Sequence, residues 1–335
     1  MRDSVPEYNS GLRADVSQMK VFRSTAEIPA GFGATVAAIG NFDGVHRGHC
    51  EILAAVVREA RSTGARAVAI TFDPHPEQYL RPERAPLLLT PMPERLRLLA
   101  ETGIDAVAVL QFDATLAGLS AREFAREILA GALGVRGLHE GHNFRLGRGA
   151  EAGIEELKAL GAELGFGVRV HEAVRVHGLE VSSSAIRALL AAGDVQRARW
   201  MLGRPFAVLS TQARGRGIGT RLLVPTVNLA PYDGLLPGFG VYVTRVKIGG
   251  RAFQAVTNVG NRPTFGEVSF AVESHILDFE PVEMDETTPV ELEFLFRLRG
   301  EMEWPSPEAL KAQIFRDVAR AKRYFRVKQL LAALA

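Results

Sequence analysis

The stretch Thr35–Leu53, TVAAIGNFDGVHRGHCEIL, decides the fold of the first half of the chain. Its opening run, Val36–Ile39, is apolar and short, which is typical of a buried strand. The Gly40-Asn41 pair favours a sharp turn, and the residues that follow place apolar side chains on one face of a helix. We therefore predict a strand, a glycine-rich turn and a helix whose first turn carries two histidines.

His46 and His49 are three residues apart, so they lie on one helical face and can both reach one group. Free backbone N–H groups and a positive dipole at a helix start, together with two imidazoles, indicate an anion site, most naturally for phosphate. Two alternatives stay open. One is a plain turn with a surface histidine pair; the other is a metal pair, for which no third ligand lies nearby in the sequence.

The composition bounds the class of protein. A length of 335 residues suggests two domains, and 47% hydrophobic with 23% charged residues is typical of a soluble globular protein. A net charge of +2 is too weak to indicate a nucleic-acid partner, and the single cysteine excludes an intramolecular disulfide. No segment approaches the ~18 apolar residues of a membrane helix, and residues 1–10 are too polar for a signal peptide. We expect a cytoplasmic protein with a polar extension over residues 1–19.

The segment GNFDGVHRGH resembles the HxGH signature of nucleotidylyltransferases, and its wording is similar to that of the prokaryotic bifunctional riboflavin kinase/FAD synthetase family. The resemblance implies that His46 and His49 are catalytic and steady the charge on the phosphates of ATP. It also implies that the turn between strand and helix binds the nucleotide. The residues of this turn are Gly40, Asn41, Phe42, Asp43 and Gly44.

Strands and helices alternate through the first 203 residues. Residues 65–72, 106–110 and 168–171 read as further strands; helices are expected after Thr90 as N-cap, from Ser120 to Leu129 with a capping box, and over residues 153–164. Short connections between alternating elements are the signature of a parallel sheet covered on both faces. We predict an α/β fold with a doubly wound parallel sheet over residues 20–203.

Two further stretches resemble the flavin side of the same family. They are Asp73-Pro74-His75-Pro76, where two prolines hold the loop extended, and GLHEGHNFRLG at residues 137–147. The second departs from the family in its polar strand and in Leu146, where phenylalanine is common. The resemblance implies flavin contacts by Pro74, His75, Asn143, Phe144 and Arg145. Without the resemblance, residues 73–76 would be a rigid strand exit with an exposed imidazole, and residues 137–147 would be a structural loop.

The serine-rich segment at residues 181–187, VSSSAIR, opens a helix. Ser183 or Ser184 can cap this helix, and its free N–H groups offer a second phosphate cradle. The segment resembles the ISSTxIR element that closes nucleotidylyltransferase sites over the triphosphate. The resemblance implies nucleotide binding by Ser182, Ser183 and Ser184 and a catalytic Arg187. A purely structural helix cap is the alternative.

The pattern becomes β-rich after Gly203, with closely spaced strands expected at residues 206–210, 240–248, 253–259, 270–277 and 289–298. We predict a small β-barrel over residues 204–335, with a terminal helix after Ser306. The loop GRGIGT contributes Gly215, Gly217 and Gly219 as candidate nucleotide ligands. It is not a dinucleotide fingerprint because Thr220 replaces the third glycine, and no Gly-Lys dipeptide exists for a Walker A loop.

PTVN at residues 225–228 resembles the PTAN motif of riboflavin kinases, which implies that Thr226 and Asn228 help hold Mg²⁺ and the ATP phosphates. Oxygen donors two residues apart suit such a hard cation. The loop before it departs from the family's Gly-Arg-x-Leu-Gly-Phe. VESHILDF at residues 272–279 is also similar to a family motif, and it implies that Glu273 is the general base. An exposed strand glutamate paired with an arginine is the alternative.

The motifs occur in the family's order over residues 20–325. The resemblance implies a bifunctional enzyme that converts riboflavin and ATP to FMN in the barrel, then FMN and ATP to FAD and pyrophosphate in the α/β domain. Mg²⁺ would act with ATP, no tightly bound organic cofactor is expected, and we expect a monomer or weak homo-oligomer with no nucleic-acid or membrane partner. Two alternatives stay open: an FMN adenylyltransferase with an impaired kinase, and a non-catalytic flavin-binding regulator.

Overall fold

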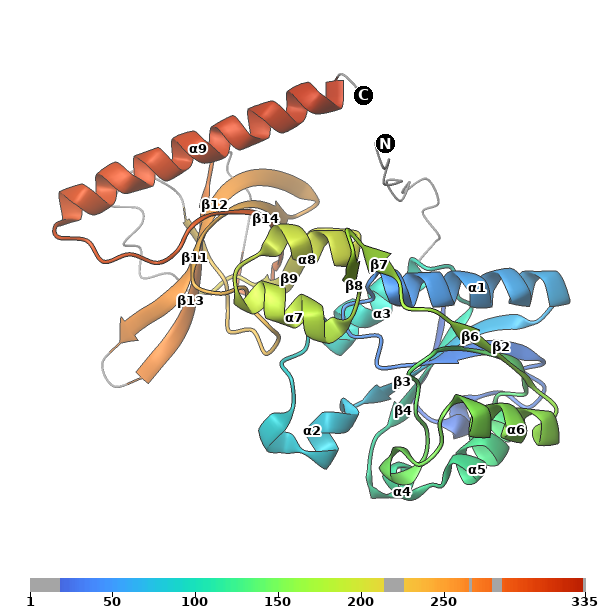
Figure 1. The fold of residues 1–335 in the computed structure, drawn as a ribbon. Coiled ribbons are helices and arrows are strands. Elements are labelled where there is room, and N and C mark those ends of the chain that lie inside the picture. Colours follow the sequence, from blue (N-terminus) through green and yellow to red (C-terminus); the bar gives the residue numbers. More distant parts are fainter. Residues whose placement is uncertain (1–18, 214–225, 265–266, 279–284, 334–335) are drawn as a thin grey trace. The chain divides into compact units, whose positions relative to one another are not determined.

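A computed structural model describes residues 19–213, 226–264, 267–278 and 285–333 of the chain. It divides into two compact units, unit 1 over residues 1–183 and unit 2 over residues 184–335, and each is described here by itself. Figure 1 shows the elements of both units. The predicted domain boundary between residues 203 and 204 stays a prediction. None of the helices in the described part of the chain is both long and apolar enough to cross a membrane.

Unit 1 is built on a six-stranded sheet in which every pairing is parallel, as predicted. The strand order is β1-β4-β3-β2-β5-β6. The connections therefore run outward in both directions from β2, and the switch point lies between β2 and β5, where open α/β sheets bind ligands at the carboxyl ends of the strands. The strands are β1 Lys20–Phe22, β2 Thr35–Ile39, β3 Arg66–Asp73, β4 Ala106–Gln111, β5 Val135–Gly141 and β6 Gly167–His171.

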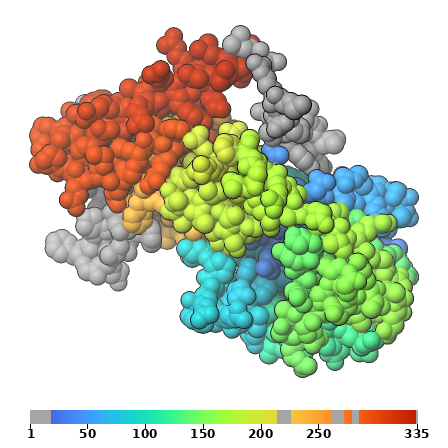
Figure 2. Space-filling model, viewed as in Figure 1, coloured from blue at the N-terminus to red at the C-terminus, as the bar shows by residue number. Residues whose placement is uncertain are grey.

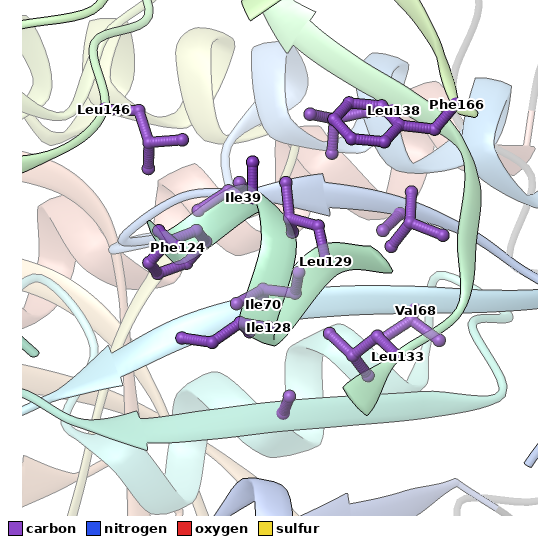
Figure 3. Packing of buried hydrophobic residues seen from close by; sticks show 14 of the residues in the cluster. Ile39, Val68, Ile70, Phe124, Ile128, Leu129, Leu133, Leu138, Leu146 and Phe166 are labelled. Atoms are coloured by element: carbon purple, nitrogen blue, oxygen red, sulfur yellow. The ribbon is translucent and has the colours of Figure 1, made fainter. Parts of the chain in front are cut away.

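Helices cover both faces of this sheet. On one face, α1 (Arg47–Thr63) and α3 (Met92–Ala100) pack Leu53 and Leu99 against β2, β3 and β4. On the other face lie α5 (Ala121–Phe124), its π-helical continuation Ala125–Ala132 and α6 (Ile154–Leu164). Figure 3 shows the second core, in which Phe124 and Leu129 point toward Ile39 and Ile70 of the strands. The predicted capping box is present, since Ser120 N donates to Glu123 and Glu123 N donates to Ser120 Oγ.

The remaining elements of unit 1 are short. They are the 3-10 turns Thr25–Glu27, Pro82–Arg84 and Arg148–Ala150, the helices α2 (Pro76–Leu80) and α4 (Ala114–Gly118), and the hairpin of β7 (Arg175–Val176) and β8 (Leu179–Glu180). The hairpin leads directly into α7 (Ser183–Ala191), whose first residue is the last residue of unit 1. The serine motif therefore spans the end of one unit and the start of the next.

Unit 2 contains the rest of α7, α8 (Val195–Leu202) and a six-stranded antiparallel sheet of order β10-β13-β12-β11-β14-β9. The two edge strands meet at a bridge between Gln212 and Leu229, and Ala230 N donates to Thr211 O at 2.9 Å beside it. The sheet thus curls until its edges touch, as the predicted barrel requires. The strands are β9 Phe206–Thr211, β10 Thr226–Asn228, β11 Gly240–Ile248, β12 Arg251–Thr264, β13 Glu267–Ile276 and β14 Pro289–Arg299.

The terminal helix α9 (Pro307–Ala333) confirms the helix expected after Ser306. Its buried residues Ala321 and Phe325 pack against apolar residues on the outer face of the sheet, among them Val243 and Leu295. In Figure 1 the red helix α9 runs along one side of the orange strands of this unit, and in Figure 2 its red atoms form that side of the unit. Helix α9 therefore covers this part of the outer face of the sheet.

Candidate active sites

The turn between β2 and α1 has an unusual backbone. Three of its four residues from Phe42 to Val45 have left-handed conformations, with φ of 46° at Phe42, 85° at Gly44 and 36° at Val45. Glycine tolerates this region, whereas a β-branched residue such as valine rarely enters it. Since Phe42 and Val45 are both almost completely buried, the surrounding core holds the turn in this shape.

The two histidines follow this turn directly. His46 is the N-cap of α1 rather than a residue inside the helix, and its Nδ1 accepts the backbone N–H of His49 at 3.3 Å. The two rings stack with centroids 3.6 Å apart, and the Phe42 ring meets His49 edge-on at 5.2 Å. A Cβ at Gly48 would lie 3.2 Å from the His46 ring, so a glycine at this position leaves room for the stack.

Asp43 points into the protein. Its carboxylate is 1% exposed and accepts the backbone N–H groups of Leu89 at 3.0 Å and Thr90 at 2.9 Å. The Thr90 hydroxyl lies 3.2 Å from the same carboxylate and accepts the Gly44 N–H at 2.8 Å. Asp43 therefore shapes the turn after β2, and nucleotide binding by this turn stays a prediction.

The predicted role of Thr90 as the N-cap of the next helix is wrong. Helix α3 begins at Met92 with Pro91 at the N-cap, and no side chain caps it. The Thr90 hydroxyl is instead used by Asp43 and Gly44 of the turn after β2, contacts that lie 46 or 47 residues away in the chain. Tertiary contacts to a buried carboxylate have replaced the local capping bond.

The structure brings the serine motif to this turn. Ser183 Oγ donates to the backbone carbonyl of Asp43 at 2.9 Å, across 140 residues of sequence. The carbonyl of Val181 lies 3.8 Å from the Cβ position of Gly48. Ser182 is half-buried beside them, whereas Ser184, which is exposed, and Arg187, which is half-buried one turn into α7, belong to unit 2.

The predicted flavin-side residues follow β3 and β5, whose carboxyl ends lie at the same edge of the sheet as that of β2. Asn143 and Arg145 are exposed, and Phe144 packs partly buried against the core of unit 1. Pro74 is exposed after a cis peptide bond. Flavin contacts by these residues stay a prediction.

His75 differs from the extended loop and the exposed imidazole expected from sequence, and its flavin contact stays a prediction. The loop is not extended beyond it, because α2 begins at Pro76 and His75 is its N-cap. Its Nδ1 accepts the Glu77 N–H at 3.2 Å, and its own N–H donates to Gln78 at 3.1 Å. The imidazole is only 7% exposed, so the alternative of an exposed imidazole is wrong.

In unit 2 the predicted kinase residues meet through strand pairing. β10 and β13 are antiparallel, with Asn228 directly opposite Glu273 and Thr226 opposite His275. Because side chains alternate along a strand, Thr226, Asn228 and Glu273 share one face of the sheet. Thr226 and Glu273 are exposed, whereas Asn228 is 9% exposed. Gly215, Gly217 and Gly219 lie outside the residues that the structure describes.

The comparisons with known proteins agree for both units. Residues 30–185 match a family model described as FAD synthetase, and residues 202–325 match one described as riboflavin kinase. A protein of Pseudomonas fluorescens is 38% identical over 86% of this chain and 92% of its own length, and one of Escherichia coli is 35% identical over 87% and 92%. Both are named bifunctional riboflavin kinase/FMN adenylyltransferase. This chain belongs to that family.

A solved structure supports the fold. A crystal structure titled macrolide-efflux protein from Streptococcus pneumoniae has a TM-score of 0.81 to this chain at 25% identity, and the match covers 91% of this chain and 99% of that one. This title describes the protein from Streptococcus pneumoniae and not the present chain. The present chain is a bifunctional enzyme with a riboflavin kinase and an FAD synthetase domain. We therefore call unit 1 the FAD synthetase unit and unit 2 the kinase unit.

Sequence reasoning missed Glu140 in the FAD synthetase unit. The β2–β5 ladder ends at Ala37 opposite Leu138, and beyond it the Glu140 side chain accepts the Ile39 N–H at 2.8 Å. Glu140 is 2% exposed, and burial raises the pKa of its carboxyl well above the ordinary value. It joins the ends of the two strands that lead into the predicted nucleotide turn and the predicted flavin motif. The polar strand noted in the sequence was the available signal.

A second buried polar group lies on the opposite face of β5. His139 is 3% exposed and contacts His171 of β6 at 2.9 Å and Glu59 of α1 at 3.0 Å. Burial lowers the pKa of both imidazoles. Burial also pushes the pKa of Glu59 upward, but the hydrogen bonds from Arg169 and His139 outweigh it and the net shift is downward. This cluster anchors α1, the helix that carries His49, against the edge of the sheet.

Proposed function

We propose that the enzyme makes FAD from riboflavin in two ATP-dependent steps, one in each unit. The kinase unit transfers the γ-phosphoryl group of ATP to the 5′-hydroxyl of riboflavin, giving FMN and ADP. In the FAD synthetase unit the FMN phosphate attacks the α-phosphorus of ATP, giving FAD and pyrophosphate. The observation that carries the proposal is the stacked His46–His49 pair, tied to the serine motif through the bond from Ser183 to Asp43.

In adenylyl transfer the FMN phosphate is itself the nucleophile, so no covalent enzyme intermediate is needed. The bond from its oxygen to the α-phosphorus forms as the bond to pyrophosphate breaks. Negative charge then grows on the ATP phosphates, and His46, His49 and Arg187 are the groups proposed to stabilise it. The backbone N–H groups in the first turn of α1 and the turn from Gly40 to Gly44 would hold the same phosphates.

In phosphoryl transfer Glu273 is the proposed general base. Its carboxylate is exposed on β13 and accepts the proton of the riboflavin 5′-hydroxyl as that oxygen attacks the γ-phosphorus and the bond to ADP breaks. The motif match to the family and the pairing opposite Asn228 support this role.

Thr226 and Asn228 fit a Mg²⁺ ion. The hydroxyl and the amide carbonyl are hard oxygen donors on one face of β10, beside the carboxylate of Glu273. Across the described ranges, no group of three or more His, Cys, Asp or Glu side chains could hold a metal ion. We propose that Mg²⁺ would arrive with ATP, whose phosphates supply further ligands, and would neutralise charge on them when bound.

The substrates ATP, riboflavin and FMN and the product FAD follow from these two steps. A cytoplasmic location, a monomeric or weakly oligomeric state and the absence of nucleic-acid and membrane partners stay predictions.

A product assay tests the proposal. The purified chain is incubated with riboflavin, ATP and Mg²⁺, flavins are separated by chromatography, and pyrophosphate is measured when FMN replaces riboflavin. We expect FMN first, then FAD with one pyrophosphate for each. FAD from FMN but no FMN from riboflavin would identify an adenylyltransferase with an impaired kinase. Flavin binding without either product would identify a non-catalytic regulator.

A further inference from the structure

Arg95 is the largest completely buried side chain of the described residues. It projects from α3 with 1% exposure, donates through Nη2 to the backbone carbonyl of Thr90 at 3.2 Å, and lies 3.8 Å from the equally buried Asp43 carboxylate. Removing two charges from water is costly, and a buried ion pair is weak evidence for added stability. The position of this arginine therefore calls for an explanation other than stability.

The contacts around Arg95 connect it to the turn after β2. Arg95 holds the carbonyl of Thr90, while the N–H and hydroxyl of Thr90 hold Asp43 and Gly44. Leu89 N donates to the other oxygen of the Asp43 carboxylate. The segment from residue 89 to residue 95 thus grips the middle of the turn after β2 by backbone and side chain together. We name the side chains of Asp43, Thr90 and Arg95 the turn clamp.

The gripped segment is the strained one. Gly44 and Val45 both have positive φ, and Phe42 on the other side of Asp43 has one too. Backbones in such conformations persist only where the surrounding structure over-determines them, and they cluster at functional sites. The turn clamp supplies contacts of this kind between Phe42 and Val45.

The strained turn also determines the positions of the two histidine rings. His46 follows Val45 immediately and stacks on His49, and the Phe42 ring lies edge-on to His49. A relaxation of the turn at residues 42–45 would move the backbone of His46 and the ring against His49 at the same time. The buried charge pair is therefore coupled to both imidazoles through the turn that Asp43 and Thr90 hold.

We propose that Arg95 is a positioning residue for adenylyl transfer, acting through Asp43 and Thr90 to hold the strained turn and so the stacked imidazoles in place. It touches no substrate. The proposal rests on the function proposed for His46 and His49. It predicts a loss in the chemical step, because the imidazoles act on charge that grows in the transition state.

The experiment compares Arg95→Met with Arg97→Met, a matched control on the same helix, whose arginine is 41% exposed and pairs with Glu94 and Glu101. We expect Arg95→Met to lower kcat for FAD formation from FMN by about 10²-fold, the size of loss that a small misplacement of catalytic groups causes. The KM values for ATP and FMN should stay close to those of the original chain. Arg95→Lys should restore part of kcat, since it keeps the charge.

The thermal unfolding profile of each variant reports whether the FAD synthetase unit is folded, and the riboflavin kinase reaction of the same sample reports that the other unit is intact. If folded Arg95→Met leaves kcat unchanged, or raises KM alone, the proposal is wrong. If Arg95→Met loses the unfolding transition of its unit, Thr90→Val decides instead. This smaller change removes the hydroxyl that holds Gly44 and contacts Asp43. A selective fall in its kcat for FAD formation supports the proposal, and an unchanged kcat overturns it.

His49→Ala separates this proposal from the proposed function. If His49→Ala still forms FAD at the original rate, the assigned chemistry of the histidines is wrong. If His49→Ala is inactive and both Arg95→Met and Thr90→Val are normal, only the positioning role of Arg95 fails.

Discussion

The two predicted phosphate sites of this enzyme are assembled in opposite ways. In the FAD synthetase unit, His46 and His49 are neighbours in sequence, but their placement depends on residues 89–95 and on Ser183, far along the chain. In the kinase unit, Asn228 and Glu273 are 45 positions apart and become neighbours through strand register alone. The first site depends on buried polar contacts, whereas the second depends on regular backbone pairing.

This difference has a consequence for mutation. A strand ladder is redundant, since β12 and β13 pair over ten residue positions and one lost contact leaves the register in place. A strained turn that is held by a few buried groups lacks this redundancy, so the loss of one contact can change its conformation. We therefore expect buried substitutions away from the substrates to damage FAD formation more than riboflavin phosphorylation.

The largest effect should come from His49→Ala. Loss of one of two stacked imidazoles removes a donor to the developing charge, so FAD formation should fall by about 10³-fold. Riboflavin phosphorylation should continue, and FMN should accumulate in the product chromatogram. FAD formation at the original rate would contradict the assignment.

Glu273→Ala should produce the reverse pattern. Without the general base, riboflavin phosphorylation should fall by about 10²-fold, while FAD still forms when FMN is supplied. Glu273→Gln, which keeps the shape but cannot accept the proton, should behave as the alanine variant does. A fully active Gln variant would assign Glu273 to packing or pairing instead of proton transfer.

Asn228→Ala should have a smaller effect that depends on the metal. The variant loses one proposed oxygen donor while the ladder stays intact, so half-maximal kinase activity should need about 10-fold more Mg²⁺. Titration of Mg²⁺ at saturating ATP measures this. Asn258→Ala is the matched control, because Asn258 pairs with Glu273 from the other side of β13 and is not a predicted ligand. Equal shifts in both variants would contradict a specific role for Asn228.

The smallest effect concerns stability and Glu140. Its pKa is raised in the folded protein from an ordinary value of 4.5, so the unfolded chain loses this proton first as the pH rises. The free energy of unfolding therefore falls from about pH 4.5 upward, until the folded carboxyl also ionises. Glu140→Gln cannot ionise, and its Tm relative to the original chain should increase between pH 4 and pH 8.

For domains of this size each 1 kcal/mol corresponds to about 2–4 °C in Tm. Thermal unfolding of the FAD synthetase unit at several pH values measures the difference. Glu155→Gln is the control, because this side chain is 80% exposed and pairs with Lys158 on α6. A Tm difference for Glu140→Gln that stays constant with pH would contradict the raised pKa.

Local pattern predicted most of the backbone. The apolar runs at residues 36–39 and 106–110 became β2 and β4 within a residue or two, because buried parallel strands need continuous apolar side chains. Prediction from sequence failed where a polar side chain could form its hydrogen bonds with more than one part of the chain. Thr90 was expected to cap its own helix and instead holds Gly44; the His75 imidazole was expected to be exposed in the alternative interpretation and instead caps α2.

The sequence by itself determined the alternation of strands and helices, the change to a β-rich second half and the motifs that indicate two ATP-dependent steps, since periodicity and short motifs are local properties of the chain. Only the tertiary structure decided that Arg95, Asp43 and Thr90 form one buried clamp, that Glu140 continues a strand ladder, and that Asn228 faces Glu273. The physical reason is that a buried charge or an unpaired backbone group takes whichever partner the fold brings within reach, and that partner need not be near in sequence.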